Sequence, residues 1–244
     1  MATWIVHLRL AENLLRLIDG LDPAYFSMGN IAPDSGIPDE NWENFDPDPK
    51  ILHFQARDSE VRDLADLEFY RQYVLAQKGK AIDPERFSFL LGYFFHLVTD
   101  NLWGEQIGQP TNERFAKEFE TDPKFIRQVK RDWYGLDFEY VRSKPDSIFW
   151  RVFLDCDYDR DYLDFLPSDA VRQRLAYIKE LYQRTDEKIE EWYINHPDRY
   201  LSKHDMDEFV DKATDTLYQI YHHLWCKNAV ALDGPSALGL SFLD

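Results

Sequence analysis

A histidine and an aspartate four residues apart, His96 and Asp100, lie in a strongly apolar stretch of the sequence, FLLGYFFHLVTD over residues 89–100. An α-helix has about 3.6 residues per turn, so positions i and i+4 share one face. The imidazole and the carboxylate are therefore expected side by side in the interior, where polar groups need partners. A divalent metal ion would satisfy both. The alternative is a core histidine hydrogen-bonded to the aspartate one turn away.

Three more residues of these types occur nearer the N-terminus in apolar or restrained surroundings. His7 lies close to the apolar face of a predicted first helix. Asp34 ends the motif GNIAPD (29–34), in which glycine and proline restrict the backbone and present the carboxylate at a defined point. An Asx-turn in an ordinary loop is the alternative for Asp34. His53 is flanked by apolar residues.

Imidazole nitrogens and carboxylate oxygens without thiolates suit zinc or a similar divalent ion. Three neutral histidines and two aspartates could hold one ion fully, or two ions with open positions for water and substrate. Two ions about 4 Å apart would clamp the attacking and leaving oxygens of a phosphoryl displacement. The predicted metal ligands are His7, Asp34, His53, His96 and Asp100.

The remaining histidines carry weaker signals. His196 stands at a predicted helix end, and His204 stands near a helix start, where exposure is expected. His222 and His223 are adjacent on a predicted helix. Their side chains diverge by about 100°, so they cannot easily share one ion.

The elements that must position the candidate ligands are predicted to be helices. Thr3 is expected to cap a first helix that ends at Gly20, and residues 58–77 are expected to form a second. Pro84 opens a third helix that runs to about residue 103. Residues 21–56 are rich in proline, glycine, asparagine and aspartate, and we expect a long functional loop there.

Helical patterns continue to the C-terminal region. Shorter helices are predicted over residues 112–119 and 123–133, and longer ones from residue 168 to about 195 and from about 205 to 227. No segment has a convincing strand pattern. The expected architecture is one all-α, multi-helix domain over residues 1–244, with its metal site built mainly from residues 1–105.

Four motifs in this order resemble the zinc-dependent phospholipase C family. They are WIVH (4–7), GNIAPD (29–34), His53 and GYFFHLVTD (92–100), so the resemblance is concentrated in residues 1–105. The family includes bacterial phosphatidylcholine-hydrolysing phospholipases and is related to fungal zinc nucleases that cleave single strands. The resemblance implies an all-helical fold and a zinc cluster.

Carried over to this sequence, the resemblance assigns roles to the same residues. His7 corresponds to the early histidine ligand, and Asp34 and His53 correspond to the loop aspartate and the histidine after it. His96 and Asp100 match the H-x-x-x-D pair, whose aspartate bridges metals in the family. Asp34 would also hold or orient the nucleophile and is the candidate catalytic residue.

The sequence departs from the family pattern in ways that reduce the expected number of ions. In the secreted relatives the mature chain begins at a tryptophan that binds one zinc, whereas three residues precede Trp4 here. Relatives also have a second group of histidine ligands, but this chain has no histidine between residues 96 and 196. Glu105, Asp132 and Asp137 are candidate replacements. One or two zinc ions are therefore expected rather than three.

Charge and composition limit the expected partners. The 244 residues include 45 acidic and 28 basic side chains, a net charge of −17. This balance repels polyanions, so we expect neither duplex nucleic acid nor an anionic membrane surface as a partner. The N-terminal residues lack the pattern of a signal peptide, and no stretch has the apolar length of a membrane span. A cytoplasmic location and a small phosphoester or phospholipid-like substrate are expected.

Two functions of different classes follow from these patterns. The first is a zinc-dependent phosphoester hydrolase, similar to phospholipase C, that uses metal-activated water. The alternative is a non-catalytic helical protein with a residual or structural metal site and an interaction role. The sequence leaves the oligomeric state open.

Overall fold

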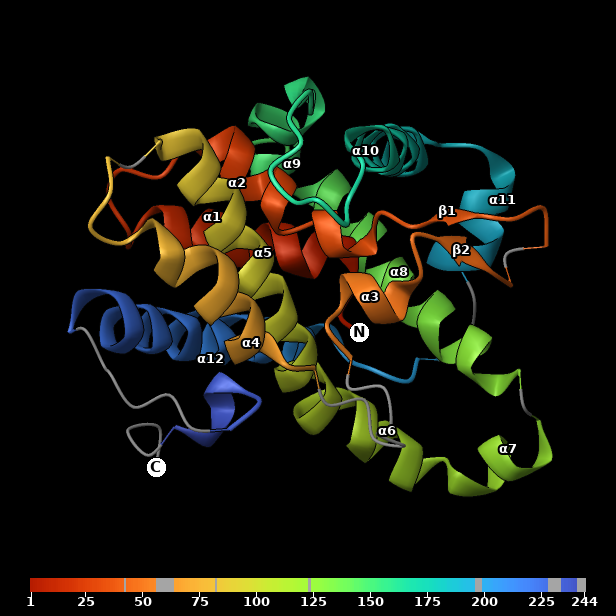
Figure 1. The fold of residues 1–244 in the computed structure, drawn as a ribbon. Coiled ribbons are helices and arrows are strands. Elements are labelled where there is room, and N and C mark those ends of the chain that lie inside the picture. Colours follow the sequence, from red (N-terminus) through yellow and green to blue (C-terminus); the bar gives the residue numbers. More distant parts are fainter. Residues whose placement is uncertain are drawn as a thin grey trace.

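The computed structural model describes residues 1–41, 43–55, 64–81, 83–122, 124–195, 199–227 and 234–240. Helices dominate this part of the chain (Figure 1), as the sequence predicted. The only sheet in it is an antiparallel pair of two-residue strands, β1 (Ile37–Pro38) and β2 (Phe45–Asp46), with Ile37 opposite Asp46. Within the described residues, none of the helices has the length and hydrophobicity that a membrane span requires.

The helices are, in chain order, α1 (Trp4–Leu15), α2 (Pro23–Gly29), α3 (Pro49–Leu52), α4 (Asp66–Phe69), α5 (Pro84–Trp103), α6 (Gln109–Arg114), α7 (Ala116–Thr121), α8 (Phe125–Ser143), α9 (Ile148–Arg151), α10 (Ser168–Gln183), α11 (Glu187–Ile189) and α12 (Lys203–Tyr221). Single π-helical turns continue several of them, over Tyr70–Val74, Gly104–Gly108, Glu190–Ile194 and His222–Cys226. Such turns recur in α-helices close to functional sites.

The central element is α5, which has the predicted bounds. Asp83 caps it by accepting hydrogen bonds from the backbone N–H groups of Glu85 and Arg86, and Pro84 occupies the first helical position. Every residue from Phe87 to Trp103 is buried. A helix that is apolar on all sides must be covered on all sides, and α1, α2, α4 and α12 pack against it.

The predicted loop over residues 21–56 is wrong, because this segment contains α2, a 3₁₀ turn (Ala32–Asp34), both strands and α3. The prolines that suggested a loop begin helices. Asp22 and Asp48 accept hydrogen bonds from backbone N–H groups, and Pro23 and Pro49 occupy the first helical positions. Proline lacks an N–H group and is pre-shaped for this position, so it starts helices as readily as it ends them.

Other predicted bounds also differ from the structure. The helix α1 ends at Leu15 instead of continuing to Gly20. Residues 58–63 of the predicted helix 58–77 lie outside the described part, and the first helix in the rest of this segment is α4. The helix expected at 123–133 continues to Ser143 as α8. The helix expected to reach residue 195 stops at Gln183, because Arg184 is extended (φ −69°, ψ 140°) and Asp186 caps α11.

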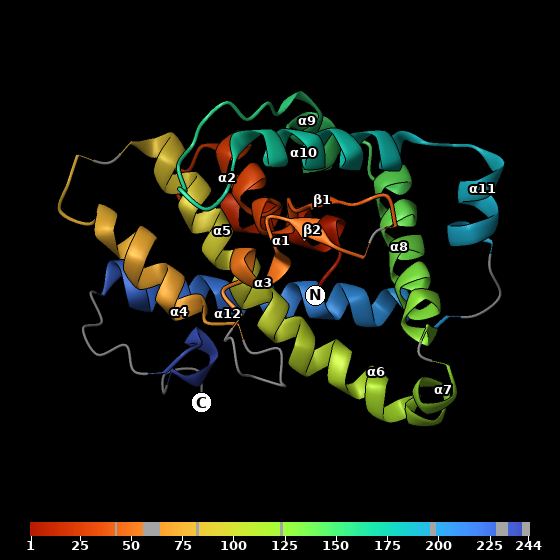
Figure 2. The ribbon, with the colours of Figure 1, turned by 45° about the vertical axis from the view of Figure 1, so that its right-hand side comes forward.

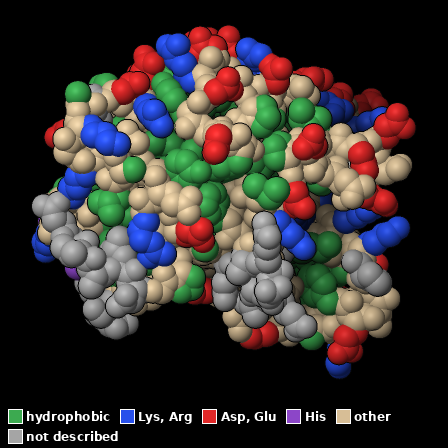
Figure 3. All heavy atoms as spheres, in the orientation of Figure 1, with side chains coloured by type: hydrophobic (Ala, Val, Ile, Leu, Met, Phe, Trp, Pro, Cys, Tyr) green, Lys and Arg blue, Asp and Glu red, His purple; other side chains and the backbone are tan. Residues whose placement is uncertain are grey.

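The elements surround the start of the chain. In both ribbon views the N-terminus lies near α3 and the strand pair (Figures 1 and 2), and α8 and α10 flank this region in the turned view. Acidic side chains are scattered over the face drawn in Figure 3, with basic side chains among them. The acidic side chains on this face therefore do not form a single acidic patch.

Candidate metal centre

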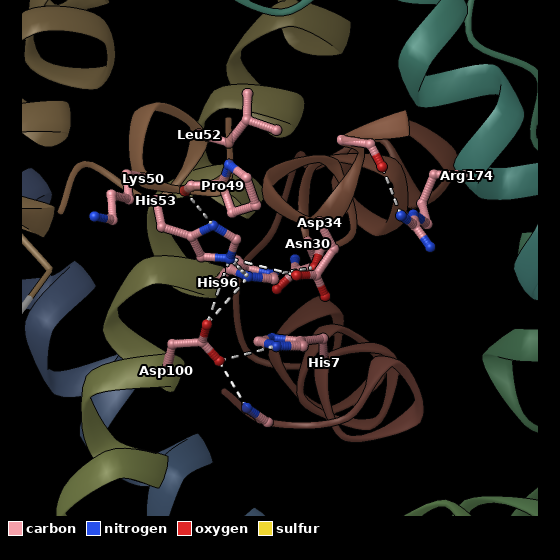
Figure 4. Close-up of polar contacts among 12 residues, drawn as sticks. His7, Asn30, Asp34, Pro49, Lys50, Leu52, His53, His96, Asp100 and Arg174 are labelled. Carbon is pink, nitrogen blue, oxygen red and sulfur yellow. Dashed lines mark hydrogen bonds and ion pairs between the residues drawn. The ribbon is translucent and has the colours of Figure 1, made fainter. Parts of the chain in front are cut away.

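The structure brings all five predicted ligands together (Figure 4). His7 comes from α1, Asp34 from the end of the 3₁₀ turn, His53 from the residue after α3, and His96 and Asp100 from α5. The three histidines and Asp100 are buried, and the side chain of Asp34 is 11% exposed. Segments far apart in the sequence therefore meet at one buried cluster of imidazoles and carboxylates, which could hold a metal ion.

Three ligand atoms of the cluster lie at nearly equal separations, and a fourth lies close to one of them. Nε2 of His96 is 3.3 Å from Nε2 of His53 and 3.5 Å from Oδ2 of Asp100, and Nε2 of His53 is 3.6 Å from the same Oδ2. Oδ1 of Asp34 is 3.3 Å from Nε2 of His53. In a tetrahedral zinc site with bonds of about 2.1 Å, neighbouring ligand atoms lie about 3.4 Å apart. His53, His96 and Asp100 therefore have the spacing of three ligands of one tetrahedral site, with Asp34 beside them.

Backbone carbonyls fix the orientation of two of these imidazoles. Nδ1 of His96 lies 2.8 Å from the carbonyl oxygen of Asn30, and Nδ1 of His53 lies 2.9 Å from that of Pro49. A carbonyl only accepts, so each Nδ1 carries a proton and each Nε2 points into the cluster. Two imidazole nitrogens and two carboxylates that face one another need a cation between them, which is either a proton on one ring or a metal ion. Metal-bound histidines have this hydrogen-bond pattern.

A second position lies on the other side of Asp100. Oδ1 of Asp100 is 3.5 Å from Nε2 of His7, and it accepts a hydrogen bond from the backbone N–H of Ala2 at 2.7 Å. The ring of His7 stacks on that of His96 with centroids 3.9 Å apart. Neither nitrogen of His7 has a hydrogen-bond partner among the described residues. Asp100 therefore lies between two ligand positions, one with His53 and His96 and one with His7, and each could hold one ion.

The charges of the cluster depend on one another. Burial lowers the pKa of His96, but Asp100 and Asp34 overcome this and raise it. Burial and the neighbouring His96 lower the pKa of His7 to about 4, so this imidazole is neutral near pH 7. Burial alone would raise the pKa of Asp100, but the amino group of the chain and His96 hold it well below its usual range. Burial likewise opposes ionisation of Asp34, and His53 and His96 overcome this and lower its pKa. Two carboxylates therefore stay ionised in a largely buried place.

A close contact between α2 and α5 places His96 beside the carbonyl of Asn30. A Cβ atom on Gly29 would lie 2.1 Å from the carbonyl oxygen of Phe89, and one on Gly92 would lie 2.5 Å from that of Phe26. Only glycine permits this approach of two backbones. The glycine of the GNIAPD motif thus serves helix packing, and the motif delivers Asn30 and Asp34 to the cluster.

Two neighbouring cavities reach the cluster. One, of about 300 Å³, is lined by Asp34, His53, Trp4 and Tyr134 among others. The second, of about 460 Å³, is lined by His53 and Asp100 together with the ends of the strand region. Small ligands of phosphoester size fit cavities of this order, so solutes can approach the ligand atoms from outside.

Of the three carboxylates expected to replace missing family ligands, two are buried and accept hydrogen bonds from other groups, and the third is exposed. Asp132 accepts hydrogen bonds from the backbone N–H groups of Tyr200 and Leu201. Asp137 accepts hydrogen bonds from Thr3 and Tyr182, and Glu105 is exposed on the π-helical turn after α5. None of the three belongs to the groups of close ligand atoms found among the described residues.

The late histidines stay apart from the cluster, as predicted. His204 and His222 are exposed and His223 is half-buried, and none of them is in a group of close ligand atoms. The prediction for His196 falls outside the described residues.

Sequence reasoning missed Arg174, which lines the smaller cavity together with Asp34. Arg174 follows Val171 by three residues and precedes Leu175 and Ile178, and all four residues are buried. This spacing places the arginine on the apolar face. The signal was therefore present in the periodicity.

In comparisons with known proteins, no family model matches this chain, and no curated protein or solved structure matches it significantly.

Proposed function

We propose that this protein is a metal-dependent phosphoester hydrolase that resembles zinc-dependent phospholipase C in its centre. The observation that carries the proposal is the set of three ligand atoms, on His53, His96 and Asp100, at 3.3–3.6 Å from one another, with Asp34 beside them and next to a cavity. Zinc is the proposed metal, because imidazole and carboxylate ligands without thiolates at this spacing suit it. One or two ions are proposed, with Asp100 bridging them when two are bound.

Different side chains around the proposed metal have different roles in the reaction. Zinc bound here would supply an electrophilic centre that polarises a phosphoryl oxygen and lowers the pKa of a water. Asp34 is the least buried ligand and faces the cavity. Because its pKa is lowered, its carboxylate stays ionised and accepts a hydrogen bond, so it can orient the attacking water toward phosphorus. The buried rings of His7 and His96 exclude water from the far side.

A structural metal site is the second candidate. If Asp34 binds the ion as a fourth protein ligand, the tetrahedral site is closed, and closed sites of this kind hold folds together. In the hydrolase the cavity admits the substrate, whereas a structural metal site needs no substrate. A variant of Asp34 distinguishes the two functions.

The test combines metal analysis with turnover. Protein dialysed against EDTA and reloaded with zinc is expected to hold one or two zinc ions per chain and to hydrolyse bis-p-nitrophenyl phosphate or p-nitrophenyl phosphate. In Asp34→Asn the ligands His53, His96 and Asp100 remain. We therefore expect near-normal zinc content with a fall in kcat of at least about 100-fold, the order contributed by a positioned proton-handling group.

His204→Asn is the matched control, because His204 is exposed and lies outside the cluster. It should change neither zinc content nor turnover. A zinc-loaded wild-type protein that hydrolyses neither ester would leave the structural site as the better account, and a protein that takes up no zinc would refute both.

A further inference from the structure

Arg174 is a buried cation beside the candidate metal centre. It lies on α10 and is 7% exposed, yet it lines the cavity of about 300 Å³ that Asp34 and His53 also line. Figure 4 shows its guanidinium near the cluster, on the side of Asp34. Removing a guanidinium from water is costly unless an anion or several acceptors compensate it.

The described residues compensate only part of the cost of burying the guanidinium of Arg174. Nη2 of Arg174 donates a hydrogen bond of 2.7 Å to the carbonyl oxygen of Gly36. The guanidinium also lies 5.4 Å from the ring centroid of Trp4 and 5.7 Å from that of Tyr177. No described carboxylate forms an ion pair with it, and its Nε–H is buried without an acceptor there. A donor in the plane of the guanidinium is thus left for a ligand.

The cavity itself favours an anion. Arg174 and Lys130 are its basic lining residues and Asp34 is its acidic one, in a chain whose net charge is −17. Aromatic rings of Trp4 and Tyr134 provide flat apolar walls of the same cavity. Guanidinium groups bind phosphate and carboxylate through parallel N–H donors, and a water-excluded site strengthens these bonds.

We propose that Arg174 binds an oxyanion of the substrate, phosphate or carboxylate, while the aromatic walls hold the ring or chain that carries it. This inference rests on the proposed function and narrows it to anionic substrates, rather than esters with a cationic head group. Arg174 is then a residue that determines specificity, and Gly36 and Trp4 hold it in place.

The test measures binding of phenylphosphonate, which cannot be hydrolysed as an ester, by calorimetry to the full-length protein loaded with zinc. Arg174→Gln is expected to raise the Kd at least tenfold, and Arg174→Lys is expected to raise it less because the charge remains. Arg172→Gln is the matched control on the same helix, since Arg172 is 47% exposed and pairs with Asp169. It should leave the Kd unchanged.

A second measurement uses the wild-type protein, so it does not depend on whether the Arg174→Gln variant folds. The Nε–H signal of Arg174 in the NMR spectrum, assigned by its loss in Arg174→Lys, is expected to move when phenylphosphonate is added to the wild-type protein. Benzoate titrated in parallel identifies the oxyanion, because the tighter of the two compounds has the preferred group.

An unmoved Nε–H signal would overturn the inference. So would a folded Arg174→Gln protein that binds phenylphosphonate within twofold of the wild type. Failure of the proposed function looks different: the wild-type protein then takes up no zinc or hydrolyses no ester. An Arg174-dependent Kd in that same protein would still support the anion site.

Discussion

At the scale of single residues, the hydrogen bond at Nδ1 of an imidazole determines where its Nε2 points and what Nε2 can bind. The carbonyl groups of Asn30 and Pro49 accept from His96 and His53, and this directs both Nε2 lone pairs into the cluster. His7 has no such partner among the described residues. Its ring is positioned by stacking on His96 instead, so we expect His7 to be the more weakly fixed ligand.

Another buried carboxylate, Asp137, connects the start of the chain to α8 and α10. Thr3 occupies the predicted capping position of α1 but makes no capping hydrogen bond, because its hydroxyl donates to Asp137 at 2.7 Å. Tyr182 donates to the other oxygen at 2.6 Å. Burial raises the pKa of Asp137 to about 7, against the lowering effect of these two hydrogen bonds.

The raised pKa of Asp137 predicts a pH dependence of stability. A carboxyl whose pKa is higher in the folded than in the unfolded chain (about 3.9) contributes stability that is complete below about pH 4. The contribution is lost as the pH rises to about 7. In Asp137→Asn this loss is absent. The free energy of unfolding of the variant relative to wild type should therefore rise with pH between 4.5 and 7, by up to about 1.4 kcal/mol per pH unit, and level off above.

Urea denaturation of both proteins from pH 4.5 to 8 measures this difference. His7 is unchanged in both proteins, so its titration cancels. Asp157→Asn, which removes an exposed carboxylate, controls for the change of charge. A pH-independent difference for Asp137→Asn would contradict the prediction.

At the scale of elements, the contact of α2 with α5 sets the distance between Asn30 and His96. The two backbones approach through Gly29 and Gly92, so a methyl group at either position has no space. Gly104, the first residue of the π-helical turn that continues α5, has free space, because a Cβ atom on it would have no neighbour within 4 Å. Gly92 and Gly104 therefore make a matched pair.

Gly92→Ala is expected to lower the free energy of unfolding by about 3 kcal/mol, at the upper end of overpacking effects, because backbone atoms must move. It should also weaken zinc binding, since the carbonyl of Asn30 moves away from His96. Gly104→Ala is expected to raise the free energy of unfolding by up to about 1 kcal/mol, the gain of alanine over glycine in a helix. Guanidinium denaturation and zinc titration test both variants, and equal effects of the two would refute the packing argument.

At the scale of the whole molecule, the candidate centre connects α1, the 3₁₀ turn, α3 and α5. A ligand that binds only the folded state stabilises it by mass action. At free zinc 1,000-fold above Kd, the free energy of unfolding should rise by about 4 kcal/mol. For a chain of this size that corresponds to an increase in Tm of about 8–16 °C.

Thermal unfolding with EDTA and with zinc measures the shift. His204→Asn should retain the full shift, whereas Asp100→Asn should lose most of it, because Asp100 lies between both ligand positions. Equal Tm values with EDTA and zinc in the wild type would show that the cluster does not bind zinc.

Sequence periodicity determined the parts of this protein that depend on neighbours along the chain. The bounds of α5, its burial, and the shared face of His96 and Asp100 follow from a helical repeat and an Asp-Pro start. The residue types of the five candidate ligands were visible too. The prediction was wrong where one residue type is typical of two structures. Proline occurs both in loops and at helix starts, and Pro23 and Pro49 begin helices inside the predicted loop.

Only the tertiary structure decided which polar residues meet. Contacts between distant segments set the nearly equal spacing of the ligand atoms of His53, His96 and Asp100, the carbonyl partners of the two histidines and the position of Arg174. Asp132 and Asp137 resemble ligands in sequence but are satisfied by a backbone turn and by hydroxyl groups. A buried carboxylate needs a partner wherever it lies, and the residue type does not say whether packing supplies a hydroxyl, an N–H group or a place for a metal.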